Sequence, residues 1–94
     1  MTISFDQRVT ARQDTLVNVV DEEAVILNLK SECYFGLDKV GTSMWNALTT
    51  SESIQAAYES LLNRYDVDGA TLRDDLVGFV EKLVEKDLVV VSGE

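Results

Sequence analysis

The chain changes its hydrophobic period near Asp38, and this change constrains the fold more than any other feature. Before it, apolar residues form short runs rich in β-branched and aromatic types, which are typical of strands. After it, the apolar residues recur at helical spacing, at Val40, Met44, Trp45 and Leu48. The Asp38 carboxylate can accept hydrogen bonds from the first-turn N–H groups of a helix. The sequence therefore predicts a strand that leads directly into a helix capped by Asp38, with Met44 and Trp45 in the core.

Three apolar runs before this helix predict a small sheet. They occupy residues 16–20, 24–29 and 33–37. The acidic triplet Asp21-Glu22-Glu23 separates the first two runs and favours a hairpin, and the polar triplet Lys30-Ser31-Glu32 forms a second turn. We expect a three-stranded antiparallel meander with the third strand at an edge.

Two further amphipathic segments predict two more helices. Thr50 or Ser51 is the expected N-cap of the first, which ends near residue 64 or 65. Asp68 is the expected N-cap of the second. The apolar stripe of this last helix comprises Leu72, Leu76, Phe79, Val80 and Leu83.

Short apolar segments lie at both ends of the chain. Alternating residues at Ile3, Phe5 and Val9 are compatible with an edge strand, and residues 88–91 form a terminal strand or an extended tail. No proline, repeat or low-complexity linker interrupts the chain, so we expect one domain.

The composition excludes several function classes. The 17 acidic residues exceed the 8 lysine and arginine residues, which argues against nucleic acid as a partner because phosphate binding needs clustered cations. Histidine, the usual general base and metal ligand, is absent. The single cysteine, Cys33, excludes an internal disulfide and a multi-cysteine zinc site, and we expect it to be a small buried apolar residue. The sequence thus predicts no catalytic residue and no cofactor.

The hydropathy pattern argues against a membrane partner. No apolar run approaches the roughly 20 residues of a membrane span, and the first four residues lack the build of a signal peptide. We therefore expect a cytoplasmic protein.

The order of strands and helices resembles a winged helix-turn-helix, and one motif makes the resemblance specific. Residues 33–38 read Cys-Tyr-Phe-Gly-Leu-Asp and lead into a helix with a tryptophan at Trp45. The pattern continues at Val40-Gly41, Met44, Leu48, Ile54, Leu61, Tyr65-Asp66-Val67, Phe79, Leu83 and Leu88-Val89. From roughly residue 16 to 91 this chain is similar to the PqqD-like family, the recognition elements of ribosomally synthesised, post-translationally modified peptides. The family commonly has asparagine at the position of Asp38, and both residues cap helices.

The resemblance implies a fold and a function. The fold is α+β and winged helix-turn-helix-like, with a three-stranded antiparallel meander followed by three helices. We expect a single PqqD-like peptide-binding domain over residues 1–94, with a folded part of about 15–91. The implied function is to bind the leader segment of a precursor peptide by β-strand addition and to present it to maturation enzymes.

The resemblance also indicates the partners. Among free-standing members, the chain is most similar to leader-binding proteins of lasso-peptide pathways, whose partners are the precursor leader peptide, a transglutaminase-like leader peptidase and a cyclase. The alternative is the peptide chaperone of pyrroloquinoline quinone biosynthesis, which delivers its precursor to a radical SAM enzyme.

The resemblance places the leader between the third strand and the last helix. The candidate peptide-binding residues are Cys33, Tyr34, Phe35, Gly36 and Leu37 on the strand, and Leu72, Arg73, Leu76, Val80 and Leu83 on the helix. An edge strand supplies unpaired main-chain groups, whereas side-chain pockets select the peptide. Tyr34 and Phe35 point to opposite faces because side chains alternate along a strand. The sequence leaves open which of the two faces the groove and in which direction the leader runs.

Two other function classes fit the sequence less well. A winged-helix transcription regulator would carry four acids of its recognition helix, Asp74, Asp75, Glu81 and Glu85, into the DNA major groove. A small enzyme is opposed by the absence of histidine and of a glycine-rich phosphate loop.

Overall fold

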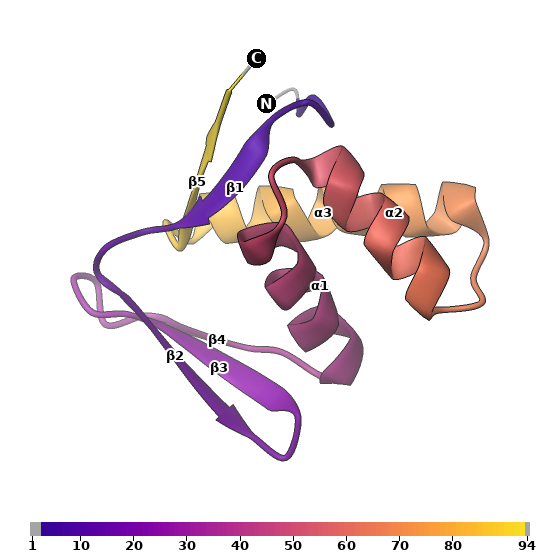
Figure 1. The fold of residues 1–94 in the computed structure, drawn as a ribbon. Helices are drawn as coiled ribbons and strands as arrows, with labels where there is room; N and C mark the ends of the chain where they lie inside the picture. The colour runs from indigo at the N-terminus through magenta and orange to yellow at the C-terminus, as the bar shows by residue number, and fades with distance from the viewer. Residues whose placement is uncertain (1–2, 94) are drawn as a thin grey trace.

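The computed structural model describes residues 3–93 as two small sheets and three helices (Figure 1). The elements are β1 (Arg8–Ala11), β2 (Thr15–Val20), β3 (Glu23–Asn28), β4 (Tyr34–Gly36), α1 (Lys39–Thr50), α2 (Ile54–Arg64), α3 (Gly69–Glu85) and β5 (Val89–Ser92). Strands β2, β3 and β4 form an antiparallel meander, and β1 pairs with β5. The predicted α+β class, the meander and the three helices are confirmed.

The meander begins with a tight hairpin. Asp21 and Glu22 have φ angles of 53° and 68°, the left-handed values that a type I′ turn requires at both central positions. Glu23, predicted to lie in the turn, instead pairs with Val20 as the first residue of β3. In β3, alternate residues are buried, Ala24 and Ile26 among them. The buried face of the meander therefore packs against the helices, and β4 lies at its edge as predicted.

Short polar side chains cap all three helices. The carboxylate of Asp38 accepts a hydrogen bond from Gly41 N at 2.8 Å, and that of Asp68 accepts one from Thr71 N at 3.0 Å, as predicted. The predicted cap of α2 was wrong, because Ser53 accepts from Ala56 N in that role. Thr50 belongs to the last turn of α1, where its hydroxyl donates to the carbonyl of Asn46.

The N-terminal segment belongs to the core, so the ordered fold begins earlier than the expected residue 15. Phe5 and Val9 are buried, and the Phe5 ring meets Tyr58 edge-on with centroids 5.8 Å apart. Val9 lies in β1, which runs beside β5 (Figure 1), whereas Phe5 precedes the strand in a turn. The sequence did not reveal this pairing because the two partners lie at opposite ends of the chain.

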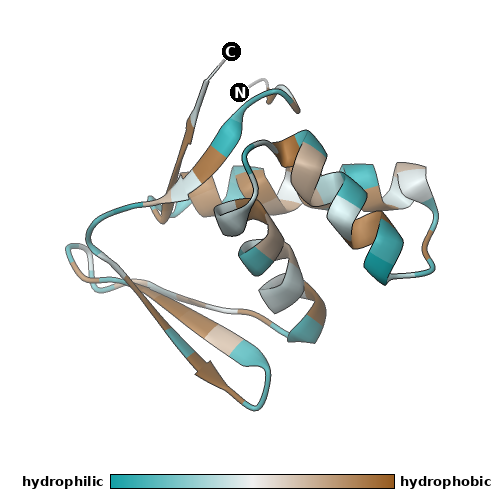
Figure 2. Cartoon of the chain, in the orientation of Figure 1, coloured by the Kyte–Doolittle hydropathy of each residue, from teal (hydrophilic) through white to brown (hydrophobic). Residues whose placement is uncertain are grey.

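The core lies between the helices and the buried face of the meander. Met44 and Trp45 are buried as predicted, and Leu48 is buried as well, whereas Val40, which shares their helical spacing, is 52% exposed. Figure 2 shows that β2 and β3 also carry many apolar residues. Among residues 3–93, no helix combines the length and hydropathy needed to cross a bilayer.

Candidate functional site

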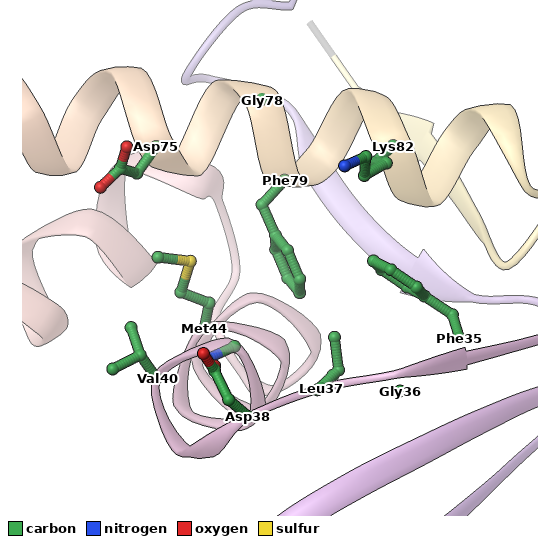
Figure 3. A pocket seen from close by; sticks show the side chains of 11 residues that line it. Phe35, Gly36, Leu37, Asp38, Val40, Met44, Asp75, Gly78, Phe79 and Lys82 are labelled. Atoms are coloured by element: carbon green, nitrogen blue, oxygen red, sulfur yellow. The ribbon is translucent and has the colours of Figure 1, made fainter.

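An open groove of about 640 Å³ lies between β4 and α3 (Figure 3). One wall comes from β4 and the start of α1, and the opposite wall comes from a single face of α3. The lining residues are Phe35, Gly36, Leu37, Asp38, Val40, Gly41, Met44, Asp75, Gly78, Phe79 and Lys82. The groove therefore runs along the free edge of the meander.

The hydrogen-bond register shows which main-chain groups of β4 are free. Asn28 N donates to Cys33 O at 2.8 Å, and Leu37 N donates to Ala24 O at 2.7 Å. In an antiparallel ladder, such bonded pairs alternate with pairs whose N–H and C=O groups point away from the neighbouring strand. The main-chain groups of Tyr34 and Gly36 therefore point to the open edge. Within residues 3–93, no main-chain bond outside the ladder uses them.

Two aromatic rings face each other across the groove. Phe35 and Phe79 have ring centroids 6.4 Å apart, and Figure 3 shows the two rings side by side. Tyr34 is 73% exposed and does not line the groove. The structure thus resolves the alternative left open by the sequence, because Phe35 is the residue that faces α3.

The floor of the groove is apolar and its ends are charged. Leu37 and Met44 are nearly buried at its base. Asp38 and Asp75 lie at one end, and Lys82 lies toward Phe35 (Figure 3). Such a surface offers apolar contact in the middle and charge at both ends.

The structure corrects most of the predicted helix side of the site. Leu76, Val80 and Leu83 are completely buried and Leu72 is 7% exposed, so these side chains fill the core. Arg73 lies elsewhere, with its guanidinium carbon 4.0 Å from the centre of the Phe5 ring. The helix turns by about 100° per residue, so the face next to the core stripe meets the groove instead.

That face carries three groove residues that the sequence analysis did not select for peptide binding, Asp75, Gly78 and Phe79. Asp75, Gly78, Phe79 and Lys82 follow the i, i+3, i+4, i+7 spacing of one helix face. The spacing is visible in the sequence, but it does not show that this face lies opposite β4. On the strand side, Phe35, Gly36 and Leu37 line the groove, whereas Cys33 does not. The expectation that Cys33 is buried was wrong, because its side chain is exposed just before β4.

The groove is lined by apolar side chains, glycines and a few charged side chains. No group of three or more His, Cys, Asp or Glu side chains within the described residues is arranged to hold a metal ion.

A family model matches the part of the chain that builds the groove. The model described as coenzyme PQQ synthesis protein D (PqqD) matches residues 23–89, from β3 to the start of β5. The chain belongs to the PqqD family. The match includes both walls of the groove, and it confirms the family identified from the motif at residues 33–38.

Solved structures resemble this PqqD-family chain over nearly its whole length. TbiB1, solved in complex with the TbiA(beta) leader peptide, is 28% identical with a TM-score of 0.82, covering 90% of this chain and 99% of that chain. Lasso peptide synthetase B1, complexed with the leader peptide, is 21% identical with a TM-score of 0.76, covering 90% and 98%. The second likeness shows the fold alone. Among curated proteins, no sequence matches this chain.

Proposed function

We propose that this chain binds the leader segment of a ribosomally synthesised precursor peptide by β-strand addition and presents it to the maturation enzymes of a lasso-peptide pathway. The observation that carries the proposal is the free edge of β4 beside a groove walled by α3. Family membership and the likeness to TbiB1, which was solved with a leader peptide, support it.

The main chain of β4 supplies the affinity in this proposal. Tyr34 and Gly36 each offer one N–H and one C=O at the open edge, and an extended leader satisfies them without reference to its sequence. Every second leader side chain then points toward α3. Apolar leader side chains bury against Phe35, Leu37 and Phe79 in the groove.

The proposed role is presentation and not catalysis. We place the chain in the cytoplasm as a non-enzymatic partner of a transglutaminase-like leader peptidase and a cyclase. Binding by strand addition needs no titrating group and no cofactor, which agrees with a groove built from main-chain, apolar and exposed charged groups.

A second candidate function follows from the family model itself, whose description names coenzyme PQQ synthesis. In that case the chain delivers its precursor to a radical SAM enzyme. The two candidates use the same groove and differ in the peptide. A transcription regulator is disfavoured, because Asp74, Asp75 and Glu81 are exposed on α3 and would repel DNA phosphates.

Titration of the ¹⁵N-labelled protein with two leader peptides tests the proposal, one from a lasso precursor and one from a pyrroloquinoline quinone precursor encoded beside homologues of this chain. We expect the lasso leader to bind and to shift the amide signals of Tyr34 and Gly36, because these amides gain hydrogen bonds. Stronger binding of the quinone precursor would favour the second candidate. Binding that leaves both amide signals in place would refute strand addition at β4.

A further inference from the structure

Charges of opposite sign lie at the two ends of the groove. Asp38 and Asp75 are at the end where β4 leads into α1 (Figure 3). Lys82 lies toward the other end, where Lys86 places its Nζ 5.7 Å from the centre of the Phe35 ring. The Phe79 ring lies between Asp75 and Lys82, and the Phe35 ring lies toward the lysine end (Figure 3).

These four charges have no ionic partner among the described residues. Within residues 3–93 the ion pairs are Arg12–Asp14 at 3.9 Å and Lys39–Glu22 at 3.7 Å, both outside the groove. Asp38, Asp75, Lys82 and Lys86 are all exposed. Asp38 uses Oδ1 to cap α1, so its second carboxylate oxygen remains for a ligand.

The spacing of the charges matches an extended peptide. Asp75 and Lys82 are seven positions apart on α3, which corresponds to about 10 Å along the helix axis, and Lys86 lies one turn farther. In a strand, side chains on the same side repeat every second residue, or about 7 Å, so three of them span roughly 13 Å. One leader segment can therefore meet the acidic end, the aromatic pair and the basic end with three alternate side chains.

We propose that the groove selects leader peptides by the order of their charged side chains. A basic side chain lies beside Asp38 and Asp75, an apolar one packs against the contacting Phe35 and Phe79 rings, and an acidic one lies beside the two lysines. β4 runs from the lysine end to the aspartate end, so a leader antiparallel to it places the basic residue before the acidic one. Antiparallel pairing is slightly more stable per residue than parallel pairing. This inference rests on the proposed function and adds the chemical class of the peptide.

Two synthetic peptides of identical composition test the inference. Both carry threonine and valine flanks, and their centres read Lys-Thr-Leu-Thr-Glu and Glu-Thr-Leu-Thr-Lys. We expect the protein to bind the first about tenfold more tightly at low salt, because two exposed attractions replace two repulsions. The preference should fall toward unity near 1 M salt, where charges are screened within about 3 Å.

Charge variants of the protein supply the matched controls. The double variant Asp75→Lys with Lys82→Asp keeps the net charge and should lose the preference, because Asp38 and Lys86 then balance the substituted charge at each end. Asp74→Lys makes the charge change of Asp75→Lys one residue away, outside the groove lining, and should keep the order of preference. Equal affinity for both peptides in the natural protein, or an undiminished preference in the double variant, would overturn this inference alone. Failure of both synthetic peptides to bind would also overturn this inference, whereas the proposed function fails only if the natural leader peptides do not shift the Tyr34 and Gly36 amides.

Discussion

The meander has two free edges, and they differ in what lies beside them. The β2 edge is six residues long and exposes Leu16, Val17, Val19 and Val20 by 38–60%. The β4 edge is only three residues long. Judged as a template for pairing, β2 is the longer and more apolar strand. Yet the groove lies along β4, and none of its lining residues comes from β2.

The comparison shows that a free edge is not sufficient for a selective site. Main-chain groups pair with any extended chain, so an edge alone cannot choose its partner. The wall of α3 adds Phe79 and two charged residues, Asp75 and Lys82, opposite β4. The α3 wall is therefore the feature that distinguishes the two edges.

The largest expected effect is on stability, and it concerns the core-facing side of α3, behind the groove. Leu76→Ala should lower the free energy of unfolding by about 2–5 kcal/mol, because the Leu76 side chain is completely buried and its loss leaves a cavity. Urea denaturation measures this change. A loss below about 1 kcal/mol would show that Leu76 is not a core residue.

The α3 side chains that line the groove should affect leader binding. Phe79→Ala should weaken leader binding by about 1–3 kcal/mol, or roughly 5- to 150-fold in Kd, because the ring is the main apolar anchor opposite Phe35. Isothermal titration measures the affinity, with circular dichroism to verify folding. Val17→Ala on the β2 edge is the control and should leave the affinity unchanged. Equal losses in the two variants would contradict the distinction between the edges.

Removing one outward N–H from each edge compares them directly. Gly36→Pro should weaken leader binding about tenfold, because proline deletes a donor and places its ring at the edge. Val17→Pro makes the same change on β2, where the register also directs the N–H of Val17 outward. Affinity should remain unchanged in this second variant. If Val17→Pro alone weakened binding, the leader would pair with β2.

The smallest expected effect is on stability, and it concerns the open space beside Gly78 on the groove side of α3. Gly78→Ala should raise the free energy of unfolding by about 0.5–1 kcal/mol, because alanine favours the helix and its Cβ would meet no atom within 4 Å. Gly69→Ala is the contrasting variant, because its Cβ would lie 2.8 Å from Tyr58 Oη. Thermal unfolding of both variants should give shifts of opposite sign. A stability loss in Gly78→Ala would show that this face of α3 is already filled.

Local signals in the sequence predicted much of the fold. The period change at Asp38, the caps at Asp38 and Asp68, and the edge position of β4 depend on neighbours only a few residues apart. The resemblance carried by the motif at residues 33–38 also indicated the strand along which the groove lies. These features follow from local hydrogen bonding and side-chain alternation, which short segments largely determine.

Other features depend on residues far apart in the chain. The pairing of β1 with β5 places Val9 opposite Val91, and no local sequence pattern predicts a partner so far along the chain.

The helix side of the groove shows the same division. The sequence by itself determined that α3 has an apolar stripe with Leu72, Leu76, Val80 and Leu83, but an amphipathic helix does not reveal which neighbour covers each part of that stripe. Only the packing of α3 against α1 and the meander assigns these four leucine and valine side chains to the core. The same packing turns Asp75, Gly78, Phe79 and Lys82 toward β4. The orientation of α3 about its own axis depends on the packing of the whole core. This part of the candidate site was therefore decided by the tertiary structure.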